Sequence, residues 1–425
     1  MMKHFTLLAL ATSFYISVSA QCSDDRYRNF NYFPGSTVTS AIEFGVNESV
    51  PPFGSTQGSP QSLKMDVYEP EGDQATDRPV VMVAFGGSFI GGSRGQVEFL
   101  CREFARLGYV AVAPDYRVGI FFPINEVQTT LAVLRGAHDM KGCVRYLRKT
   151  VAEDGNPYGI DPDMIFIGGV SAGAISAIHA AYLDDIATEI PAYLVNDTAG
   201  LGGLEGLSGP LTYTSEVQGV FSYSGAIGDT SWMIDNDVPI ISFHEEEDPT
   251  VPYLTQEVAV SGIPTGLIAS GSFDLHVRAE NAGMDNCFTG YPGNGHVGFL
   301  GNGNYAEVLG KTADFLADIV CAETMDCGEV IYAADTSLNT AINQFDIIEM
   351  RLYPNPASDF VIVDITASAH DLNGWNLIDL QGRIVLEGSF TSTRQKIEVS
   401  SLESGSYVLK AWGNEALGEM SIIVQ

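Results

Sequence analysis

Short, nearly continuous apolar runs recur along the first two thirds of the chain and limit what it can fold into. Such runs are typical of strands that are covered on both faces. Between them, apolar residues from Val127 to Leu147 recur at three- and four-residue steps, the pattern of an amphipathic helix. Alternating strands and helices predict a mainly parallel sheet with helices on both faces, an α/β fold. The expected strands are Ser62–Tyr68, Pro79–Ala84, Val110–Ala113, Met164–Ile167, Val220–Tyr223 and Pro239–Phe243.

The composition sets the size and the chemical class of the molecule. The chain has 425 residues, of which 45% are hydrophobic, and subtracting 53 Asp and Glu from 21 Lys and Arg leaves a formal charge of −32. This apolar fraction is enough for a large core and a smaller second domain, which excludes a disordered chain. A charge this negative repels phosphate backbones and anionic lipid, so we expect no nucleic-acid partner.

Residues 1–20 have the features of a secretory signal peptide. Lys3 precedes an apolar run, and Val18–Ala20 is a small-residue cleavage pattern. A membrane anchor needs about 20 unbroken apolar residues, and Ser and Thr residues interrupt this segment. We therefore expect a soluble mature protein that begins at Gln21 and has no transmembrane segment. Gln21 also disfavours lipid attachment at Cys22.

The cysteines that remain after this cleavage indicate disulfides. In an exported protein an even number favours pairing, although the sequence does not choose among the many pairings. Cys321 and Cys327 form the most local candidate pair. No spacing is CxxC with a suitable His nearby, so we expect no zinc site. The cysteines are Cys22, Cys101, Cys143, Cys287, Cys321 and Cys327.

Changes of composition divide the chain. We expect a catalytic domain over residues 21–321, a polar connector over 322–348 and a second domain over 349–425. Residues 184–218 interrupt the alternating pattern with Gly, Thr, Pro and acidic residues. This predicts an insertion that is either a lid or pocket wall, or a passive surface excursion.

Beyond residue 349, short alternating segments separated by turns predict a small antiparallel β-sandwich. Its expected strands are Phe360–Ile365, Trp375–Leu380, Ile384–Leu386, Ile397–Val399 and Tyr407–Ala411.

The strongest chemical signal is Gly169-Val170-Ser171-Ala172-Gly173. Glycines two residues before and after a serine allow a sharp strand-to-helix turn that exposes the hydroxyl at the carboxyl edge of a sheet. Met164–Ile167 supplies the strand and Ala174–Tyr182 a helix of small residues. Because this is the context that such a turn requires, we predict Ser171 as a catalytic nucleophile rather than part of a glycine-rich turn.

A glycine-rich loop, Phe85–Gly92, directly follows the strand that ends at Ala84. Such loops point backbone N–H groups at a developing oxyanion, and the expected donors are those of Gly87, Ser88 and Ala172. A phosphate-binding loop is the alternative. It is disfavoured because no Lys-Ser or Lys-Thr follows and the spacing is not GxGxxG.

A nucleophilic serine needs an imidazole to take its proton and a carboxylate to orient that imidazole. His296 lies in a glycine-flanked segment after the last expected strand, and Asp248 follows an apolar strand that ends near His244. The order Ser171, Asp248, His296 suits this class of site. We expect His244 to brace the acid loop. The acids that remain as alternatives are Glu245, Glu246 and Glu247.

Together these segments resemble the α/β-hydrolase carboxylesterases, over roughly residues 40–320. Further similar blocks are Ala113–Arg117, the helix that carries Asp139, Tyr158–Pro162 and His244–Tyr253. The resemblance implies an α/β-hydrolase fold with an eight-stranded, mostly parallel sheet. It also implies ester hydrolysis through an acyl-enzyme, without a metal or organic cofactor.

The resemblance departs from the family pattern in the glycine-rich loop. Many lipase-like members have His where this chain has Phe85, and Ser88 stands in place of a third glycine. An oxyanion hole built from main-chain N–H groups tolerates both changes, because these donors do not depend on the side chain. The contacts that support this loop must therefore differ from those in lipase-like members that have His at this position.

The tail resembles another family. Leu352–Ala357, Asp379–Arg383 and Leu402–Tyr407 are similar to the C-terminal sorting domain of type IX secretion cargo. This implies passage through the periplasm and export by the type IX machinery to the cell surface or beyond, often with removal of the tail. An accessory binding sandwich is the alternative.

The sequence as a whole predicts a secreted serine carboxylesterase. Its location suggests small or polymer-derived esters, including feruloyl esters and polyesters, as substrates. One alternative is a serine peptidase of the same fold, although residues 21–60 leave no room for the propeller or large cap that such enzymes carry. The other is a catalytically silent surface adhesion protein. Aromatic candidates for an acyl or aryl pocket, which otherwise belong to the core, are Phe89, Phe121, Phe122, Tyr223 and Trp232.

Overall fold

The computed structural model divides into two compact units, Met1–Ala334 and Asp335–Gln425. The expected signal peptide, residues 1–20, lies outside the described residues, as does most of the expected connector 322–348. The residues that the structure describes are 22, 24–51, 58–120, 124–194, 201–260, 262–301, 303–325, 327, 346–347, 350–365, 372–379, 384–390, 392–402, 404–413 and 416–425.

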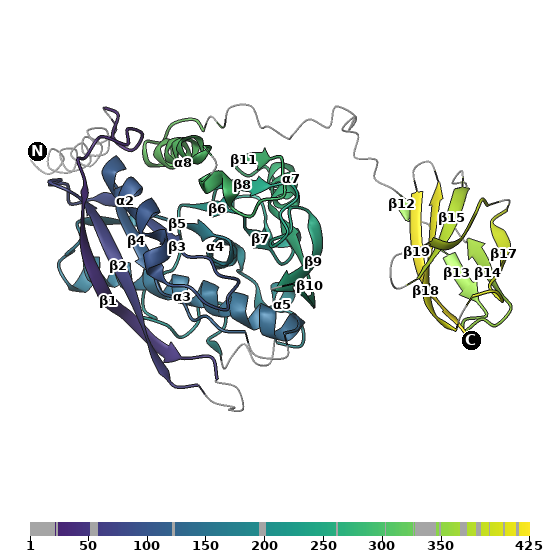
Figure 1. The fold of residues 1–425 in the computed structure, drawn as a ribbon. Coiled ribbons are helices and arrows are strands. Elements are labelled where there is room, and N and C mark those ends of the chain that lie inside the picture. Colours follow the sequence, from purple (N-terminus) through teal and green to yellow (C-terminus); the bar gives the residue numbers. More distant parts are fainter. Residues whose placement is uncertain are drawn as a thin grey trace, which may run out of the picture. The chain divides into compact units, whose positions relative to one another are not determined.

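The first unit is built on an eight-stranded sheet with the order β1-β2-β4-β3-β5-β6-β8-β11 (Figure 1). Strand β2 runs antiparallel to β1 and β4, and the remaining neighbours are parallel. The six strands expected from the apolar runs are confirmed as β2, β3, β4, β5, β6 and β8. The bounds are β1 Ser36–Glu48, β2 Pro60–Pro70, β3 Arg78–Ala84, β4 Val110–Pro114, β5 Ile160–Val170, β6 Gly219–Tyr223, β8 Ile240–Glu245 and β11 Asn286–Tyr291.

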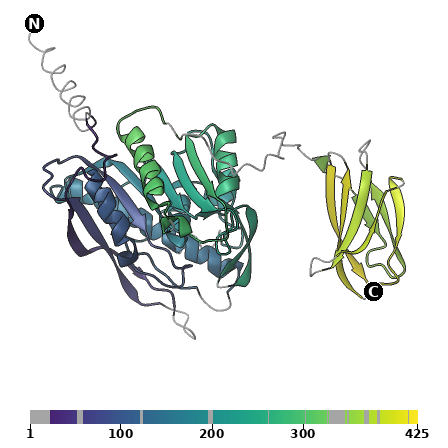
Figure 2. The ribbon, with the colours of Figure 1, turned by 45° about the horizontal axis from the view of Figure 1, so that its top comes forward.

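Helices cover both faces of this sheet, with α2 and α8 on one face and α3 and α4 on the other (Figures 1 and 2). The side chain of Asn125 starts α3 by accepting the N–H of Gln128 at 3.0 Å, which satisfies one free N–H of the first turn. The eight-stranded, mostly parallel sheet with helices on both faces confirms the expected α/β-hydrolase fold. The helices are α2 Glu98–Leu107, α3 Glu126–Glu153, α4 Ala172–Tyr182, α5 Ile186–Glu189, α7 Ser272–Ala282 and α8 Tyr305–Val320, with short 3₁₀ turns at Arg94–Val97, Thr230–Trp232 and Gly298–Leu300.

A second, smaller sheet has the order β7-β10-β9. Its strands are β7 (Ala226–Ile227), β9 (Thr255–Val260) and β10 (Ile263–Gly271), and β9 and β10 form an antiparallel hairpin. This hairpin was not predicted from the sequence. It lies beside α3 and α4 (Figure 1) and contributes to the site described below.

The described part of the 184–218 insertion packs against α3. Arg145 of this helix donates to the carbonyl oxygens of Ser208 at 2.6 Å and Pro210 at 2.7 Å, and its guanidinium also pairs with Glu205 at 2.7 Å. Ser208 in turn donates to Asp139, which is fully buried. These contacts fasten the segment to the side of the first unit.

Among the described residues, two disulfides link parts of the first unit that lie far apart in the sequence. Cys22 pairs with Cys321, and Cys287 pairs with Cys327. The most local candidate pair, Cys321–Cys327, was therefore wrong. The chain brings each of these residues next to a cysteine far away in sequence, 299 residues away in the first pair. Since Cys22 carries a disulfide, its sulfur is not free for a lipid.

The second unit is a small β-sandwich with its own core. One sheet has the order β12-β19-β18-β15-β16 and the other β13-β14-β17, which confirms the expected sandwich. All pairings within it are antiparallel except those of β12 with β19 and of Ala357 with Val424. The strands are β12 Asp346–Ile347, β13 Met350–Tyr353, β14 Phe360–Ile365, β15 Leu372–Asp379, β16 Ile384–Gly388, β17 Arg394–Glu398, β18 Gly405–Gly413 and β19 Ala416–Val424.

Candidate active site

Ser171 occupies a strained turn between β5 and α4. Its φ of 54° and ψ of −120° lie in a region that residues with a side chain rarely adopt. The turn needs glycine on both sides, because a Cβ at Gly169 or at Gly173 would collide with the carbonyl oxygen of Ala84. Ser171 N–H donates to Tyr223 O at 2.8 Å, which fixes the turn against β6. The hydroxyl is thus held at the carboxyl edge of the sheet.

The imidazole of His296 bridges Ser171 and Asp248, although the three residues come from three different loops. Nδ1 of His296 donates to Oδ2 of Asp248 at 2.7 Å. A protonated Nδ1 leaves Nε2 unprotonated, and Nε2 accepts the hydroxyl of Ser171 at 2.9 Å. The structure therefore brings together all three residues that the sequence analysis selected, in the arrangement that general-base activation of a serine requires.

Asp248 is fully buried and receives hydrogen bonds at both carboxylate oxygens. Oδ1 accepts the N–H groups of Thr250 at 2.8 Å and Val251 at 3.1 Å, while Oδ2 faces His296. Burial alone would raise the pKa of Asp248. Hydrogen bonds from His244, His296 and the Thr250 N–H outweigh it and hold the pKa of this carboxyl well below its ordinary value. The carboxylate stays charged beside the imidazole.

His244 lies behind the carboxylate, as expected for a residue that braces the acid loop. It is fully buried, and its Nε2 lies 3.4 Å from Asp248 Oδ2 and 3.2 Å from Val251 O. Its Nδ1 lies 2.8 Å from Ser272 Oγ on α7. Since both neighbours of Nε2 are acceptors, this nitrogen carries a proton and donates to the acid loop.

The three glutamates kept as alternative acids lie elsewhere. Glu245 is buried and accepts the N–H of Phe299 at 3.1 Å. Glu246 is half-buried and Glu247 is exposed. The hydrogen bond that His296 makes through Nδ1 goes to Asp248, so the geometry favours Asp248 among the candidate acids.

The glycine-rich loop after β3 packs directly against the turn of Ser171. A Cβ at Gly86 would lie 3.2 Å from Cβ of Ser171 and 3.1 Å from Val170 O, which is tighter than an ordinary contact, so glycine suits this close approach. Within the described residues, the N–H groups of Gly87 and Ser88 donate to no carbonyl. The N–H of Ala172, in the first turn of α4, has no partner within its helix. These donors can serve an oxyanion.

Phe85, the first residue of this loop, braces it through its ring and its carbonyl oxygen. Its buried ring stacks on Tyr116 with 4.3 Å between ring centres, and the hydroxyl of Tyr116 donates to Phe85 O at 2.8 Å. Tyr116, which lies just beyond β4, thus supports the loop both by ring stacking and by a hydrogen bond. Ser88 and Phe89, with φ of 53° and 58°, are held in left-handed conformations.

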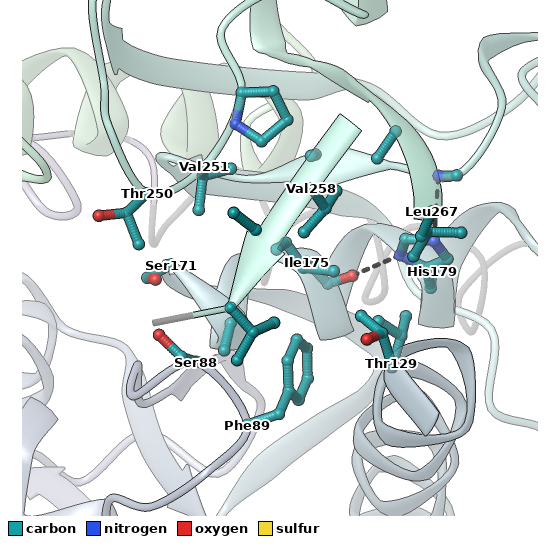
Figure 3. Close-up of a pocket in the computed structure, with 18 residues that line it drawn as sticks. Ser88, Phe89, Thr129, Ser171, Ile175, His179, Thr250, Val251, Val258 and Leu267 are labelled. Carbon is teal, nitrogen blue, oxygen red and sulfur yellow. Dashed lines mark hydrogen bonds between the residues drawn. The ribbon is translucent and has the colours of Figure 1, made fainter. Parts of the chain in front are cut away.

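A cavity opens beside Ser171, Ser88 and Ala172. Of the aromatic candidates, Phe89 lines it (Figure 3). Tyr223 lies in the core and shares a hydrogen bond with Thr312 at 3.0 Å, and Trp232 packs near His179 outside the cavity lining. Phe121 and Phe122 lie outside the described residues. The lining from the β9–β10 hairpin was not predicted from the sequence, where the short apolar run Val258-Ala259-Val260 was the available signal.

The part of the chain that the structure describes holds no group of three His, Cys, Asp or Glu side chains that could bind a metal ion. Among the same residues, no helix has the length and apolar character to cross a membrane.

Comparison with family models finds one match within each unit. Residues 65–200 match the model described as BD-FAE, and residues 351–425 match the secretion system C-terminal sorting domain. The chain therefore joins an esterase-like α/β-hydrolase domain to a type IX sorting domain. The sorting domain directs the chain to the cell surface or outside the cell.

Individual relatives are esterases and lipases. Esterase B1 of Culex pipiens is 28% identical over 121 residues, which are 28% of this chain and 22% of that protein. Lipase 1 of Geotrichum candidum is 28% identical over 133 residues, 30% of this chain and 23% of that protein. The match thus spans less than a quarter of the length of these curated relatives. Among solved structures, the esterase of Thermogutta terrifontis bound to propionate is 23% identical with a TM-score of 0.45, covering 64% of this chain and 93% of that one.

Proposed function

We propose that this protein is a secreted serine carboxylesterase. Ser171 Oγ attacks the ester carbonyl while His296 Nε2 takes its proton, and the N–H groups of Gly87, Ser88 and Ala172 stabilise the oxyanion. His296 then protonates the leaving alcohol, and an acyl-enzyme remains on Ser171. Water attacks the acyl group, again losing a proton to His296, and the acid leaves as the proton returns to Ser171. Asp248 stabilises the imidazolium in both steps.

The observation that carries this proposal is the pair of hydrogen bonds at His296. Its distances of 2.9 Å to Ser171 and 2.7 Å to Asp248 are those of a working general base before any rearrangement. The esterase-like family match supports the same reaction class. A silent scaffold would gain nothing from a strained serine conformation, which costs about 1–3 kcal/mol.

The reaction is tested by comparing 4-nitrophenyl acyl esters with aminoacyl 4-nitroanilides. We expect turnover of the esters with no detectable cleavage of the anilides, and covalent labelling of Ser171 by a fluorophosphonate probe. Cleavage of the anilides alone would assign a peptidase. A folded protein that neither turns over esters nor reacts with the probe would refute the esterase proposal and favour a catalytically silent adhesion protein.

We also propose that the sandwich unit is the address that the type IX machinery reads. Deleting residues 349–425 in the native host should lower the amount of protein at the cell surface and in the medium at least tenfold. The periplasmic protein should keep its specific activity, because the two units have separate cores. The measurement is immunoblotting of cell fractions alongside an activity assay. An inactive Ser171→Ala chain with an intact tail is the control and should be exported normally. Normal delivery of the deleted chain would refute the sorting role.

A further inference from the structure

The cavity beside Ser171 runs from the glycine-rich loop toward the far end of α4 (Figure 3). Ser171 and Ser88 lie at one end, and His179, Thr129 and Leu267 lie at the other. Its walls come from α3, α4, the loop after β3 and the β9–β10 hairpin. Most of the remaining lining is hydrocarbon, supplied among others by Phe89, Val133, Ile175, Val251, Val258 and Val260.

The position of His296 tells which half of an ester enters this cavity. The leaving oxygen must lie near His296 Nε2 to receive its proton. Ser88 and Ala172, whose N–H groups are the proposed oxyanion donors, line the cavity, whereas His296 does not. With the carbonyl carbon at Ser171 Oγ, the alcohol therefore points toward His296 and the acyl chain toward the cavity.

The polar side chains at the far end are already engaged within the protein. Nδ1 of His179 donates to Ile175 O at 2.8 Å, and its Nε2 accepts the N–H of Gly228 at 3.2 Å. Burial lowers the pKa of His179 to about 4, so the ring is neutral. Thr129 donates its hydroxyl to Asn125 O at 2.9 Å. A charged or polyhydroxylated acyl group would lose its water here without gaining equivalent hydrogen bonds.

The enclosed space that the cavity offers an acyl group is small. Its volume is about 70 Å³. An apolar protein cavity that holds one benzene molecule measures roughly 150 Å³. A short aliphatic chain fits the smaller space, and a phenyl ring does not. The cavity thus argues against the feruloyl esters that the extracellular location suggested.

We infer that this cavity is the acyl pocket and that it selects esters of short, neutral aliphatic acids, with Leu267 of the β9–β10 hairpin limiting the chain length. This inference rests on the proposed esterase function. Leu267 is suited to this role because it belongs to a surface hairpin at the end of the cavity. The neighbouring Ile268 on the same strand is 52% exposed and does not line the cavity.

The test measures kcat/KM for 4-nitrophenyl acetate, butyrate, hexanoate, octanoate and ferulate, which share one leaving group. We expect the wild type to prefer acyl chains of up to about four carbons, since each methylene that does not fit costs roughly tenfold or more. Leu267→Ala should raise the octanoate-to-butyrate ratio at least tenfold. Leu267→Phe should lower the butyrate-to-acetate ratio by a similar factor. Ile268→Ala is the matched control and should change neither ratio.

A wild type that hydrolyses the octanoate or the ferulate faster than the butyrate would overturn the inference and leave the esterase function intact. So would two folded Leu267 variants with unchanged ratios. Failure to hydrolyse any ester, with Ser171 unlabelled by a fluorophosphonate, would overturn the proposed function and this inference together.

Discussion

Replacing Ser171 with alanine should lower kcat for 4-nitrophenyl butyrate by about 10⁶-fold and abolish labelling by a fluorophosphonate. The hydroxyl is the only group removed, and losing the nucleophile of a serine triad removes the acyl-enzyme route entirely. Alanine keeps the Cβ, so the strained φ of 54° stays as it is. The free energy of unfolding should change little. Steady-state kinetics and urea unfolding of the same preparation measure both effects.

The matched control is Ser176→Ala, one turn further along α4. Its buried hydroxyl donates to Ala172 O at 2.8 Å within the helix. Its loss should cost about 1 kcal/mol of stability with kcat within a few-fold of the wild type. Residual ester turnover by Ser171→Ala at more than a thousandth of the wild-type rate would show that another residue is the nucleophile.

Replacing Asp248 with asparagine should lower kcat by roughly 10⁴-fold with a much smaller change in KM. An amide can present its NH₂ to Nδ1 of His296, which then takes the tautomer that places the proton on Nε2. That nitrogen can no longer accept the hydroxyl of Ser171. Glu247→Gln, at an exposed acid one residue away, should leave kcat unchanged. Equal loss in both variants would contradict the assignment of Asp248.

The same substitution gives a stability signature with a definite sign. The folded-state pKa of Asp248 lies below its value in the unfolded chain, which is about 3.9. Its ionisation therefore stabilises the fold above about pH 4, and this contribution is lost as the pH falls through the lower folded-state pKa. Urea unfolding should show Asp248→Asn less stable than the wild type at pH 7. The difference should narrow progressively below about pH 4.

The sequence predicted the scaffold of the site because the relevant signals are local. Continuous apolar runs identify strands buried on both faces, and the stripe from Val127 to Leu147 lies within α3. The turn at Ser171 is specified by residues within two positions of it. Asp248 and His296 could be selected because each follows a strand whose carboxyl end must reach the same edge of a parallel sheet.

Features that depend on contacts between distant residues were beyond such reasoning. The disulfide pairing is set by how β11, α8 and the N-terminal segment meet in space, so the spacing of Cys321 and Cys327 misled. The support of the glycine-rich loop by Tyr116 needs β3 and β4 to lie side by side. The hairpin β9–β10 was missed because Gly262, Pro264 and Gly266 interrupt its β-strand pattern.

The bond between Cys22 and Cys321 turns the whole hydrolase unit into a covalent ring that excludes the sandwich. A protease that trims the chain beyond Cys327 would release the sandwich without opening this ring or separating Cys287 from its partner. A single nick in a surface loop inside the ring would leave two fragments still joined by sulfur. In the extracellular medium, where proteases are abundant and reductants scarce, the mature enzyme would survive both kinds of cut as one molecule.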